Sequence, residues 1–478
     1  MFFDRIEEVN FLNQLLERRR PGPGQLFLLY GRRRVGKTHL LRRWAELSGI
    51  PFTYWAAEKE PAANQRRKLF AKVFQQSFRF APILPSWQET WDAIAERIGQ
   101  EKHILILDEL PWAAEGDPAM LSSLQHAWDQ QFKDSNLIIA LSGSQVRAME
   151  RLQFHQSPLF GRLTGQWHLQ PLPFETLIEF FPNWSIEERI ALYAIVGGIP
   201  AYFEWLDPKF SLVKNIKNVI LNNGSMFLGE PMMLLYDEIR EPQSFLAILK
   251  AIGSGAHTLK EISNEAMIGS GQLSSYLKRL QELRFVERRL PATVPNNKRR
   301  LSKSGRYHIS DPYFRFYFRF IAPFHEVLPF NTDPVLTQIE THLRAFVGAT
   351  AFEALCREYL RRFCKREKSE TQPERIGSHW SRRVQIDVVA INWHEKQLYL
   401  GECKWGGTAT KLSQLRELVE EKTPKLIQDM DIDVNQWSIQ YLFFSRSGFT
   451  SACDSFAHMN RMHLVDLQAF EKMFQIND

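Results

Sequence analysis

The sequence predicts an α/β fold in which a parallel sheet is covered by helices on both faces. Short apolar runs, each the length of one buried strand, alternate with helical stretches over the first third of the chain. Strands that alternate with helices favour a parallel, three-layer arrangement. At 478 residues the chain is too long for one ordinary core, so we expect three or so domains.

The elements expected in the first domain alternate between helix and strand. They are a helix over 4–20, a PGPG turn at 21–24, and strands at 26–30, 52–55, 104–107 and 137–141. Residues 173–250 have a mainly helical pattern. Three prolines mark residues 322–340 as a connector, and an α/β pattern begins near residue 345.

Composition excludes several classes of protein. The apolar share of 44% is that of a soluble globular chain, and no apolar run approaches the roughly 18 residues of a membrane span. The N-terminus, MFFDRIEEVN, carries acids where a signal peptide would carry a basic stretch. The four cysteines lack paired CxxC spacing, which argues against a disulfide framework or a zinc site. We therefore expect a cytoplasmic protein without membrane contact.

A phosphate-binding motif follows the first predicted strand. GRRRVGKT at 31–38 satisfies GxxxxGK[ST] and precedes a helix expected over Lys37–Leu47. Its glycines let the backbone curl so that N–H groups face the phosphates at the positive end of that helix. Lys37 would neutralise the β and γ oxygens of ATP, and the Thr38 hydroxyl would bind Mg²⁺. The residues expected to contact the nucleotide are Gly31, Arg32, Arg33, Arg34, Val35, Gly36, Lys37 and Thr38.

Two adjacent acids end a later strand. HILILDEL at 103–110 is an apolar strand followed by Asp108 and Glu109. Asp108 would hold Mg²⁺ through water, and Glu109 would orient and deprotonate the attacking water. An acidic pair after a strand is common at turns. Its position some 70 residues after the phosphate-binding loop predicts an ATPase.

Two further positions have both a catalytic and a structural interpretation. The strand at 137–141 ends in SGSQ, where Ser144 or Ser142 would reach the γ-phosphate or the attacking water, or would cap a helix at 145–151. Arg162, in SPLFGRLTG, is either an arginine finger for phosphoryl transfer or an ordinary surface arginine.

These motifs, in this order, resemble the archaeal-type P-loop ATPase family within the AAA+/STAND-like ATPases. The resemblance also includes FGR at 160–162 and GGIPAY at 197–202, and it covers roughly residues 1–330. It implies an AAA+-like ATPase core over 1–172 and a helical lid over 173–243. In that family Gly197, Gly198 and Pro200 would belong to a nucleotide-sensing turn; from the residues alone, GGIP is a turn that breaks a helix.

Residues 258–310 carry the basicity of the chain. They contain eleven Lys and Arg and four Asp and Glu, a net charge of +7, against +6 for the whole sequence. The pattern predicts helices at 245–252, 258–266 and 272–283, and strands at 285–289 and 307–309 around a loop with KRR at 298–300.

This layout is typical of a winged helix, which we assign to residues 244–321. Thr258 and Glu261 would cap its second helix. The third helix would enter the major groove of DNA while the wing contacts phosphates. The alternative is a winged helix that packs against protein.

The aromatic run DPYFRFYFRF at 311–320 follows this segment. Stacking on nucleic-acid bases is one interpretation. A buried amphipathic helix, with Arg315 and Arg319 on its solvent face, is favoured.

Two strand-like runs near the C-terminus bring carboxylates together. A hairpin of VQIDVVAIN and QLYLGECKW, centred between residues 394 and 395, pairs residues whose numbers add to 789. Asp387 then faces Glu402, about 5 Å away at Cβ, with Lys404 on the same face. Two acids and a lysine would bind a divalent cation and hold a water against a phosphodiester. The alternative is a surface pair that the lysine balances.

The order Glu353, Asp387, Glu402-Cys-Lys404 resembles the PD-(D/E)xK nuclease pattern. Glu353 lies on a helix containing FEALCREYLRRF and would add a further ligand. The stretch 345–478 also resembles the domain attached to the same ATPase family. The resemblance implies a restriction-endonuclease-like α/β domain in which these four residues are catalytic. Ile386 stands where the pattern has proline, which is a frequent variation.

Together these interpretations predict an ATP- and Mg²⁺-dependent protein that acts on nucleic acid. Duplex DNA is favoured, although a nuclease site attacks the phosphate and does not separate DNA from RNA. The alternative is a nucleotide-switched DNA-binding regulator or signalling ATPase without cleavage activity. An arginine finger from a neighbouring subunit would require a homo-oligomer.

Overall fold

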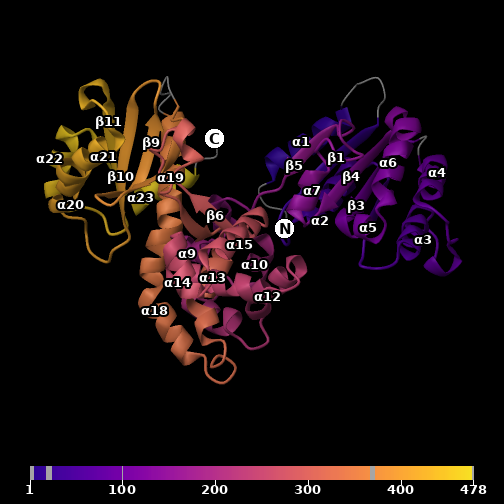
Figure 1. Cartoon of the computed structure of the whole chain (residues 1–478), viewed down its shortest axis with the longest axis horizontal. Coiled ribbons are helices and arrows are strands. Elements are labelled where there is room, and N and C mark those ends of the chain that lie inside the picture. The colour runs from indigo at the N-terminus through magenta and orange to yellow at the C-terminus, as the bar shows by residue number, and fades with distance from the viewer. Residues whose placement is uncertain (1–4, 18–23, 99–100, 367–371, 476–478) are drawn as a thin grey trace. The chain divides into compact units, whose positions relative to one another are not determined.

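The computed structural model describes residues 5–17, 24–98, 101–366 and 372–475, and the chain divides into two compact units (Figure 1). The N-terminal unit comprises residues 1–172 and 199–204, and the C-terminal unit comprises residues 173–198 and 205–478. The finer division into lid, winged helix and C-terminal domain stays a prediction, because all three fall mainly within the second unit.

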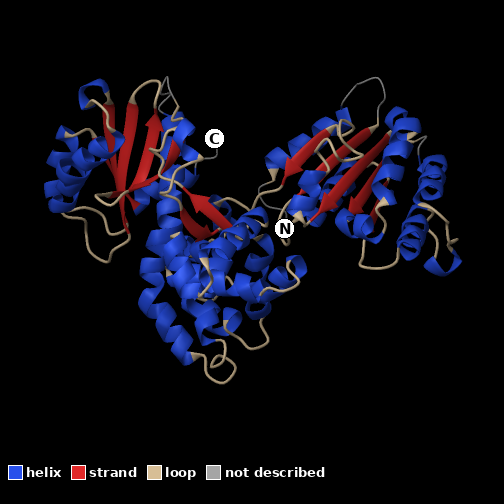
Figure 2. Ribbon diagram, in the orientation of Figure 1, coloured by secondary structure: helices blue, strands red, loops and turns tan. Residues whose placement is uncertain are grey.

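A sheet of five parallel strands, in the order β2-β3-β4-β1-β5, forms the centre of the N-terminal unit (Figure 2). The strands are β1 (Gln25–Tyr30), β2 (Phe52–Ala56), β3 (His103–Asp108), β4 (Leu137–Gly143) and β5 (Gly165–His168). The helices are α1 (Ile6–Glu17), α2 (Lys37–Ser48), α3 (Ala62–Val73), α4 (Trp87–Ile98), α5 (Leu110–Gly116), α6 (Ala119–Gln130), α7 (Val146–Arg151) and α10 (Pro200–Trp205). The predicted strands and the parallel α/β fold are confirmed. The ends of the helix predicted over 4–20, and residues 21–23 of the PGPG turn, lie outside the described residues.

Apolar side chains cover both faces of this sheet. One layer comes from α1 and α2 and includes Leu12, Leu40 and Trp44. The other comes from α3 to α7 and includes Trp91 and Leu124. Parallel strands place their carboxyl ends at one edge, so the segments that follow β1, β3 and β4 meet there.

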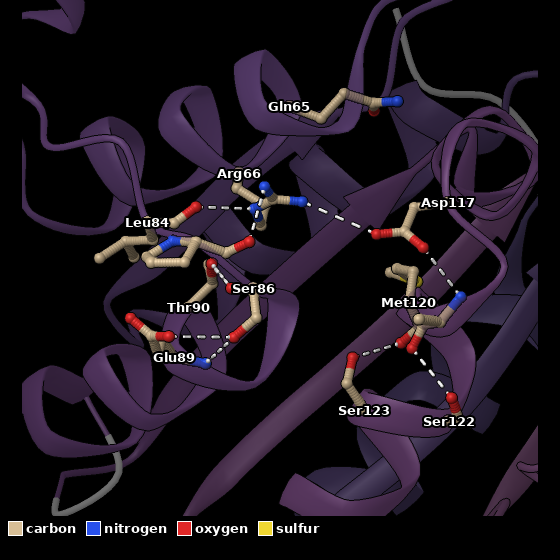
Figure 3. Close-up of polar contacts among 12 residues, drawn as sticks. Gln65, Arg66, Leu84, Ser86, Glu89, Thr90, Asp117, Met120, Ser122 and Ser123 are labelled. Atoms are coloured by element: carbon tan, nitrogen blue, oxygen red, sulfur yellow. Dashed lines mark hydrogen bonds and ion pairs between the residues drawn. The ribbon is translucent and has the colours of Figure 1, made fainter.

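The connection between α3 and α4 is fixed by an arginine (Figure 3). Arg66 is buried; its Nε donates to the Leu84 carbonyl at 3.0 Å and its Nη2 to the Pro85 carbonyl at 3.1 Å. The same guanidinium pairs with Asp117, which precedes α6, at 3.7 Å. These contacts tie the connection to α3 although Phe80 within it is 83% exposed.

Helices dominate the first part of the C-terminal unit. They are α8 (Leu177–Phe180), α9 (Ile186–Val196), α11 (Leu212–Asn215), α12 (Met226–Glu238), α13 (Gln243–Ser254), α14 (Leu259–Ala266), α15 (Ser270–Glu282), α16 (Asn296–Arg299), α17 (Pro312–Phe316), α18 (Asp333–Val347) and α19 (Glu353–Arg366). A two-stranded antiparallel sheet joins β6 (Val286–Arg289) to β7 (Arg306–Ile309). The predicted cap is confirmed: the Thr258 hydroxyl accepts the Glu261 N–H at 3.3 Å, and the Glu261 carboxylate accepts the Thr258 N–H at 2.9 Å.

Two expectations for this unit are wrong. Residues 333–340 of the expected connector belong to helix α18, in which Pro334 lies in the first turn, where a missing N–H removes no helical hydrogen bond. Arg315 is not on a solvent face, because its guanidinium donates to the Ile309 carbonyl at 3.1 and 3.3 Å. Burial lowers the pKa of Arg315 to about 10. The neighbouring aromatic side chains are buried, which removes base stacking as an interpretation of residues 311–320.

A mixed sheet in the order β12-β11-β10-β9-β8 ends the C-terminal unit (Figure 2). Its strands are β8 (Arg375–Trp380), β9 (Gln385–Asn392), β10 (Gln397–Lys404), β11 (Ser438–Ser445) and β12 (Met462–Asp466). Its helices are α20 (Leu412–Arg416), a π-helical turn at Glu417–Lys422, α21 (Thr423–Met430), α22 (Ala452–Met459) and α23 (Leu467–Gln475). The predicted hairpin register is confirmed, since the paired residues of β9 and β10, such as Val388 and Gly401, have numbers that add to 789. Within the described ranges, no helix combines the length and the apolar character needed to cross a bilayer.

Two half-buried histidines lie at the β6–β7 sheet: His308 belongs to β7, and His257 precedes α14. The rings of His308 and His257 stack with centroids 4.4 Å apart. Burial lowers the pKa of both, and for His308, where Arg289 and His257 also contribute, the pKa falls to about 2. Arg306 and Arg315 act in the same direction on His308, whereas Glu261 partly offsets the effect on His257.

We expect these histidines to make folding stability depend on pH. In the unfolded chain His308 is protonated below about pH 6.5, whereas in the folded chain it stays neutral until about pH 2. The contribution of His308 to the free energy of unfolding is therefore fully present above about pH 6.5 and is lost as the pH falls below that value. His308→Gln should flatten the decline in urea midpoint between about pH 6.5 and 4.5. His394→Gln, at a histidine whose side chain is 88% exposed, is the control. Parallel curves for wild type and His308→Gln would contradict the prediction.

Candidate functional site

The loop between β1 and α2 has the backbone shape that a phosphate cradle needs. Gly36 has φ 99°, a left-handed conformation that favours glycine, and Arg34 has φ 68°. A Cβ at Gly31 would lie 2.5 Å from the Leu169 carbonyl oxygen, so this position also requires glycine. Both glycines are those that the motif predicted.

Lys37 points into the curve of this loop. Its side chain is buried, and its ammonium donates to the carbonyl oxygens of Gly31 and Arg32, each at 3.0 Å. Burial lowers the pKa of Lys37, while Glu109 and Asp108 oppose the shift. A cation removed from water interacts more strongly with an anion that reaches it.

The metal-binding oxygens predicted for the ATPase site are adjacent. The Thr38 hydroxyl donates to Asp108 Oδ2 at 2.5 Å, and the Tyr54 hydroxyl donates to the same oxygen at 3.1 Å. Burial, followed by the charge of Asp108, raises the pKa of Tyr54, so the phenol stays protonated. A hydroxyl and a carboxylate that meet at one point form the hard oxygen donor set that Mg²⁺ prefers.

Glu109 is held in a defined position beside Asp108. Its backbone is left-handed, with φ 50° and ψ 40°, which is uncommon for a residue other than glycine. Its Oε2 accepts the Ser144 hydroxyl at 2.8 Å and the Ser144 N–H at 3.1 Å. The capping interpretation of Ser144 is therefore wrong: Gln145 precedes α7 and no side chain caps that helix. Ser142 is fully buried within β4.

Arg162 is engaged elsewhere in the same unit. Its Nε and Nη2 donate to the two oxygens of Asp129, at 2.9 and 2.8 Å, and its Nη1 donates to the Pro158 carbonyl at 3.1 Å. Asp129 lies on α6. The finger role stays a prediction, and it requires Arg162 to leave this bidentate ion pair.

The C-terminal carboxylates lie where the hairpin places them. Asp387 and Glu402 are the next residues in the confirmed register, and the Cys403 N–H donates to Asp387 Oδ2 at 3.2 Å. Glu402 is 2% exposed. Two lysines approach its oxygens: Lys422 Nζ at 2.8 Å and Lys404 Nζ at 3.4 Å.

Glu353 lies at the start of α19, which packs against β9. Its carboxylate pairs with Arg357 at 3.5 Å, and Arg357 donates to the Asp387 carbonyl at 3.1 Å. Burial, with the Asp387 charge as the next cause, raises the pKa of Glu353 and that of Glu402 to about 7 each. The charge of Asp387 thus disfavours the ionised forms of both Glu353 and Glu402.

A cation between Asp387 and Glu402 would relieve this repulsion, and carboxylate oxygens suit Mg²⁺. Within the described ranges, no three His, Cys, Asp or Glu side chains are gathered closely enough to form a metal site. The fitting donor set is therefore a pair of carboxylates, and Mg²⁺ commonly binds to one or two carboxylates with water as its remaining ligands.

Comparison with known proteins agrees with the N-terminal geometry. Residues 2–206 match a family described as an ATPase domain predominantly from Archaea, and residues 317–416 match archaeal and bacterial proteins of unknown function. Uncharacterized protein MJECL04 of Methanocaldococcus jannaschii is 33% identical over 408 residues, which are 85% of this chain and 88% of that protein. The chain belongs to the family of this archaeal protein. Its match over residues 2–206 makes it an ATPase.

Solved structures give weaker likenesses to this family member. The Walker-type ATPase PABY2304 of Pyrococcus abyssi has a TM-score of 0.47 and 23% identity, over 66% of this chain and 96% of that one. The ORC2 protein of Aeropyrum pernix in its ADP form has a TM-score of 0.36 and 15% identity, over 71% and 93%. At TM-scores below 0.5, neither likeness bears on what this chain does.

Several contacts that shape the two sites carry no sequence signal of their own. Arg5 donates to the Val35 carbonyl at 3.0 Å and the Gln170 carbonyl at 2.9 Å, so it braces the phosphate-binding loop from α1's N-terminal end. Arg32 donates to the Tyr202 hydroxyl at 3.2 Å, which brings the end of GGIPAY to this loop. Lys422 reaches Glu402 from a π-helical turn, which no motif identified.

The substitution Arg5→Met in this ATPase should weaken its binding of nucleotide. The change keeps much of the length of the side chain but leaves the Val35 and Gln170 carbonyls without a charged donor, which costs about 1–3 kcal/mol for each. We expect a lower unfolding midpoint and a raised Kd for ATP, measured by urea denaturation and by titration with a fluorescent nucleotide. An unchanged Kd with a lowered midpoint would show that Arg5 acts on stability alone.

Proposed function

We propose that this ATPase acts on nucleic acid, with duplex DNA as the favoured target, and that its C-terminal part is a Mg²⁺-dependent nuclease-like domain. The observation that carries the nucleic-acid part is the pair of half-buried Asp387 and buried Glu402, with Lys404 and Lys422 beside Glu402. Two carboxylates and two ammonium groups at one sheet end form a site for a phosphodiester and a divalent cation.

Hydrolysis of ATP is assigned to the residues after β1, β3 and β4. Lys37 binds the β and γ oxygens, and Glu109 accepts a proton from the attacking water. Ser144, through its two hydrogen bonds, holds Glu109 at the angle that this transfer needs. Thr38 and Asp108 would hold Mg²⁺, which neutralises charge on the phosphates when bound.

Residues 244–321 act as a winged helix in this proposal. The three helices α13 to α15 and the β6–β7 sheet occur in the order of that motif. Helix α15 buries Leu273, Leu277 and Leu280 and exposes Ser274 and Lys278, so a polar face is open to a groove of DNA.

The C-terminal site is suited to phosphodiester hydrolysis. Asp387 and Glu402 would hold Mg²⁺, which supplies Lewis-acid polarisation of the phosphate when bound. Lys404 can orient a water or stabilise charge on the phosphate, and it shares one sheet face with both acids. Arg357 fixes Glu353 and the Asp387 backbone, so it is a positioning residue.

A regulator without cleavage activity is a second candidate, and one observation favours it. Both oxygens of Glu402 have a lysine partner, as in a structural ion network that carries no metal. In this case the nucleotide bound at the ATPase site controls the affinity for DNA. Asp387→Asn then changes neither ATP hydrolysis nor DNA affinity.

Purified protein tests the proposal with three measurements. ATP turnover with Mg²⁺ should occur, duplex DNA should bind with an affinity that falls with salt, and Mg²⁺ should permit cleavage of DNA or RNA. Binding without cleavage under any divalent cation selects the regulator. Binding that does not fall with salt removes phosphate contact and with it the nucleic-acid proposal.

Lys278→Gln is the matched test of the winged helix. Loss of one phosphate contact from α15 should lower duplex affinity and reduce the salt slope by about 0.9. Lys209→Gln, at an exposed lysine outside the winged helix, should leave both unchanged. Equal affinities for wild type and Lys278→Gln would mean that Lys278 of α15 does not contact the duplex.

A further inference from the structure

The loop that joins β6 to β7, residues 290–305, is docked on the C-terminal sheet. The Ala292 N–H donates to the Ser378 carbonyl at 2.8 Å, along the outer edge of β8. Arg375 of β8 donates to the carbonyls of Ala292 at 3.1 Å and Val294 at 2.7 Å. Ala292 is 1% exposed and belongs to the apolar core of the C-terminal sheet. This loop, the wing of the proposed winged helix, is therefore not free in solvent.

A buried polar chain fixes the docking. Thr293 Oγ1 lies 2.7 Å from His379 Nδ1, and His379 Nε2 lies 3.3 Å from Asp429 Oδ2. Burial lowers the pKa of His379, which keeps the ring neutral, so Nε2–H donates to the carboxylate and Nδ1 accepts the hydroxyl proton. Thr293 and His379 are both buried, and such a matched pair specifies one position of the loop on β8.

Cations from the loop and from the C-terminal sheet adjoin at this junction. The Trp380 indole N–H donates to the Ser304 carbonyl at 2.9 Å, and the Arg306 guanidinium lies 5.0 Å from the Trp380 ring centre. Exposed Lys303 precedes Ser304 in the chain, and exposed Arg382 lies two residues after Trp380. The nearby acid Asp429 is already engaged by His379 and by Arg383, the latter at 3.7 Å.

The junction also lies close to the carboxylates. β8 pairs with β9, and Arg357 bonds both the Ser378 hydroxyl, at 3.0 Å, and the Asp387 carbonyl. At Ala292 the docked loop is thus separated from Asp387 by two strand spacings, or about 10 Å. That is about three base-pair steps along the axis of a duplex.

We infer that the β6–β7 loop (residues 290–305) and the turn between β8 and β9 (residues 381–384) form one phosphate-binding surface that holds duplex DNA beside Asp387 and Glu402. This inference rests on the nucleic-acid binding proposed above and adds the surface that binds. Lys303 and Arg382 contact consecutive phosphates of one strand. The Thr293–His379 contact fixes the position of the loop on β8. The winged helix and the carboxylate site therefore engage the same stretch of duplex.

Neutral substitutions on the two sides test the shared surface. Full-length protein binds a fluorescent duplex in EDTA, which prevents cleavage, at several salt concentrations. Lys303→Gln and Arg382→Gln should each reduce the slope of log K against log salt by about 0.9, and the double variant by about 1.8. Lys425→Gln and Lys472→Gln, at exposed lysines on α21 and α23, should keep the wild-type slope. Thermal unfolding verifies that all variants fold.

The outcomes separate this inference from the proposed function. If either Lys303→Gln or Arg382→Gln retains the wild-type slope, the surface is not shared and the inference is overturned. If Lys425→Gln reduces the slope to the same extent, the inference is overturned as well, because the loss of one positive charge anywhere on the protein would then explain the reduced slope. Wild-type protein that does not bind duplex at all would remove the nucleic-acid proposal itself.

Discussion

The Glu109→Gln variant is expected to bind ATP as wild type does and to hydrolyse it about 10²–10⁴-fold more slowly, the range for loss of a general base. Glutamine keeps the size of the side chain and can still accept the two hydrogen bonds from Ser144. It cannot accept the proton of the attacking water. The rate of hydrolysis is measured as steady-state phosphate release, and the Kd for ATP is measured by titration with nucleotide.

Glu115→Gln is the matched control for this variant. Glu115 is exposed on α5, the helix that begins directly after Glu109. Its substitution should leave kcat and nucleotide affinity unchanged. If Glu109→Gln hydrolyses ATP within a few-fold of wild type, another group serves as the base and the assignment fails.

The second large effect is expected at the C-terminal site. Glu402→Gln should lower Mg²⁺-dependent cleavage by about 10²–10³-fold, because a ligand that contributes several kcal/mol of charge stabilisation is lost. ATP turnover and duplex affinity should not change. The comparison uses cleavage rates of labelled DNA and RNA with saturating Mg²⁺.

Glu421→Gln provides the control for this change, since Glu421 is exposed and precedes Lys422 in the same π-helical turn. It should cleave at the wild-type rate. Equal cleavage by Glu402→Gln and wild type would remove the nuclease assignment, and Lys404 would then serve only to balance a buried acid.

Patterns of short range allowed much of both sites to be predicted from sequence. The phosphate-binding loop is specified by eight consecutive residues, of which Gly31 and Gly36 have the required backbone roles. The carboxylate pair followed from a hairpin, because a short turn fixes the register of both strands. In each case neighbours in the chain determine the geometry.

Contacts between distant segments could not be predicted in the same way. Ser144 has two roles open to it in the sequence, and only the pairing of β3 with β4 brings it to Glu109. The partner of Arg162 is Asp129, 33 residues earlier on α6. Docking of the β6–β7 loop on β8 joins residues more than 80 positions apart, such as Thr293 and His379.

Assignment of residues 199–204 to the N-terminal unit has a practical consequence for dissecting the protein. The chain passes from one unit to the other at 172/173, 198/199 and 204/205, so no single cut separates them. A fragment that ends at residue 172 would lack Tyr202 and the hydrogen bond it accepts from Arg32. Truncations meant to isolate ATP turnover should therefore extend to residue 206, where the ATPase family match also ends.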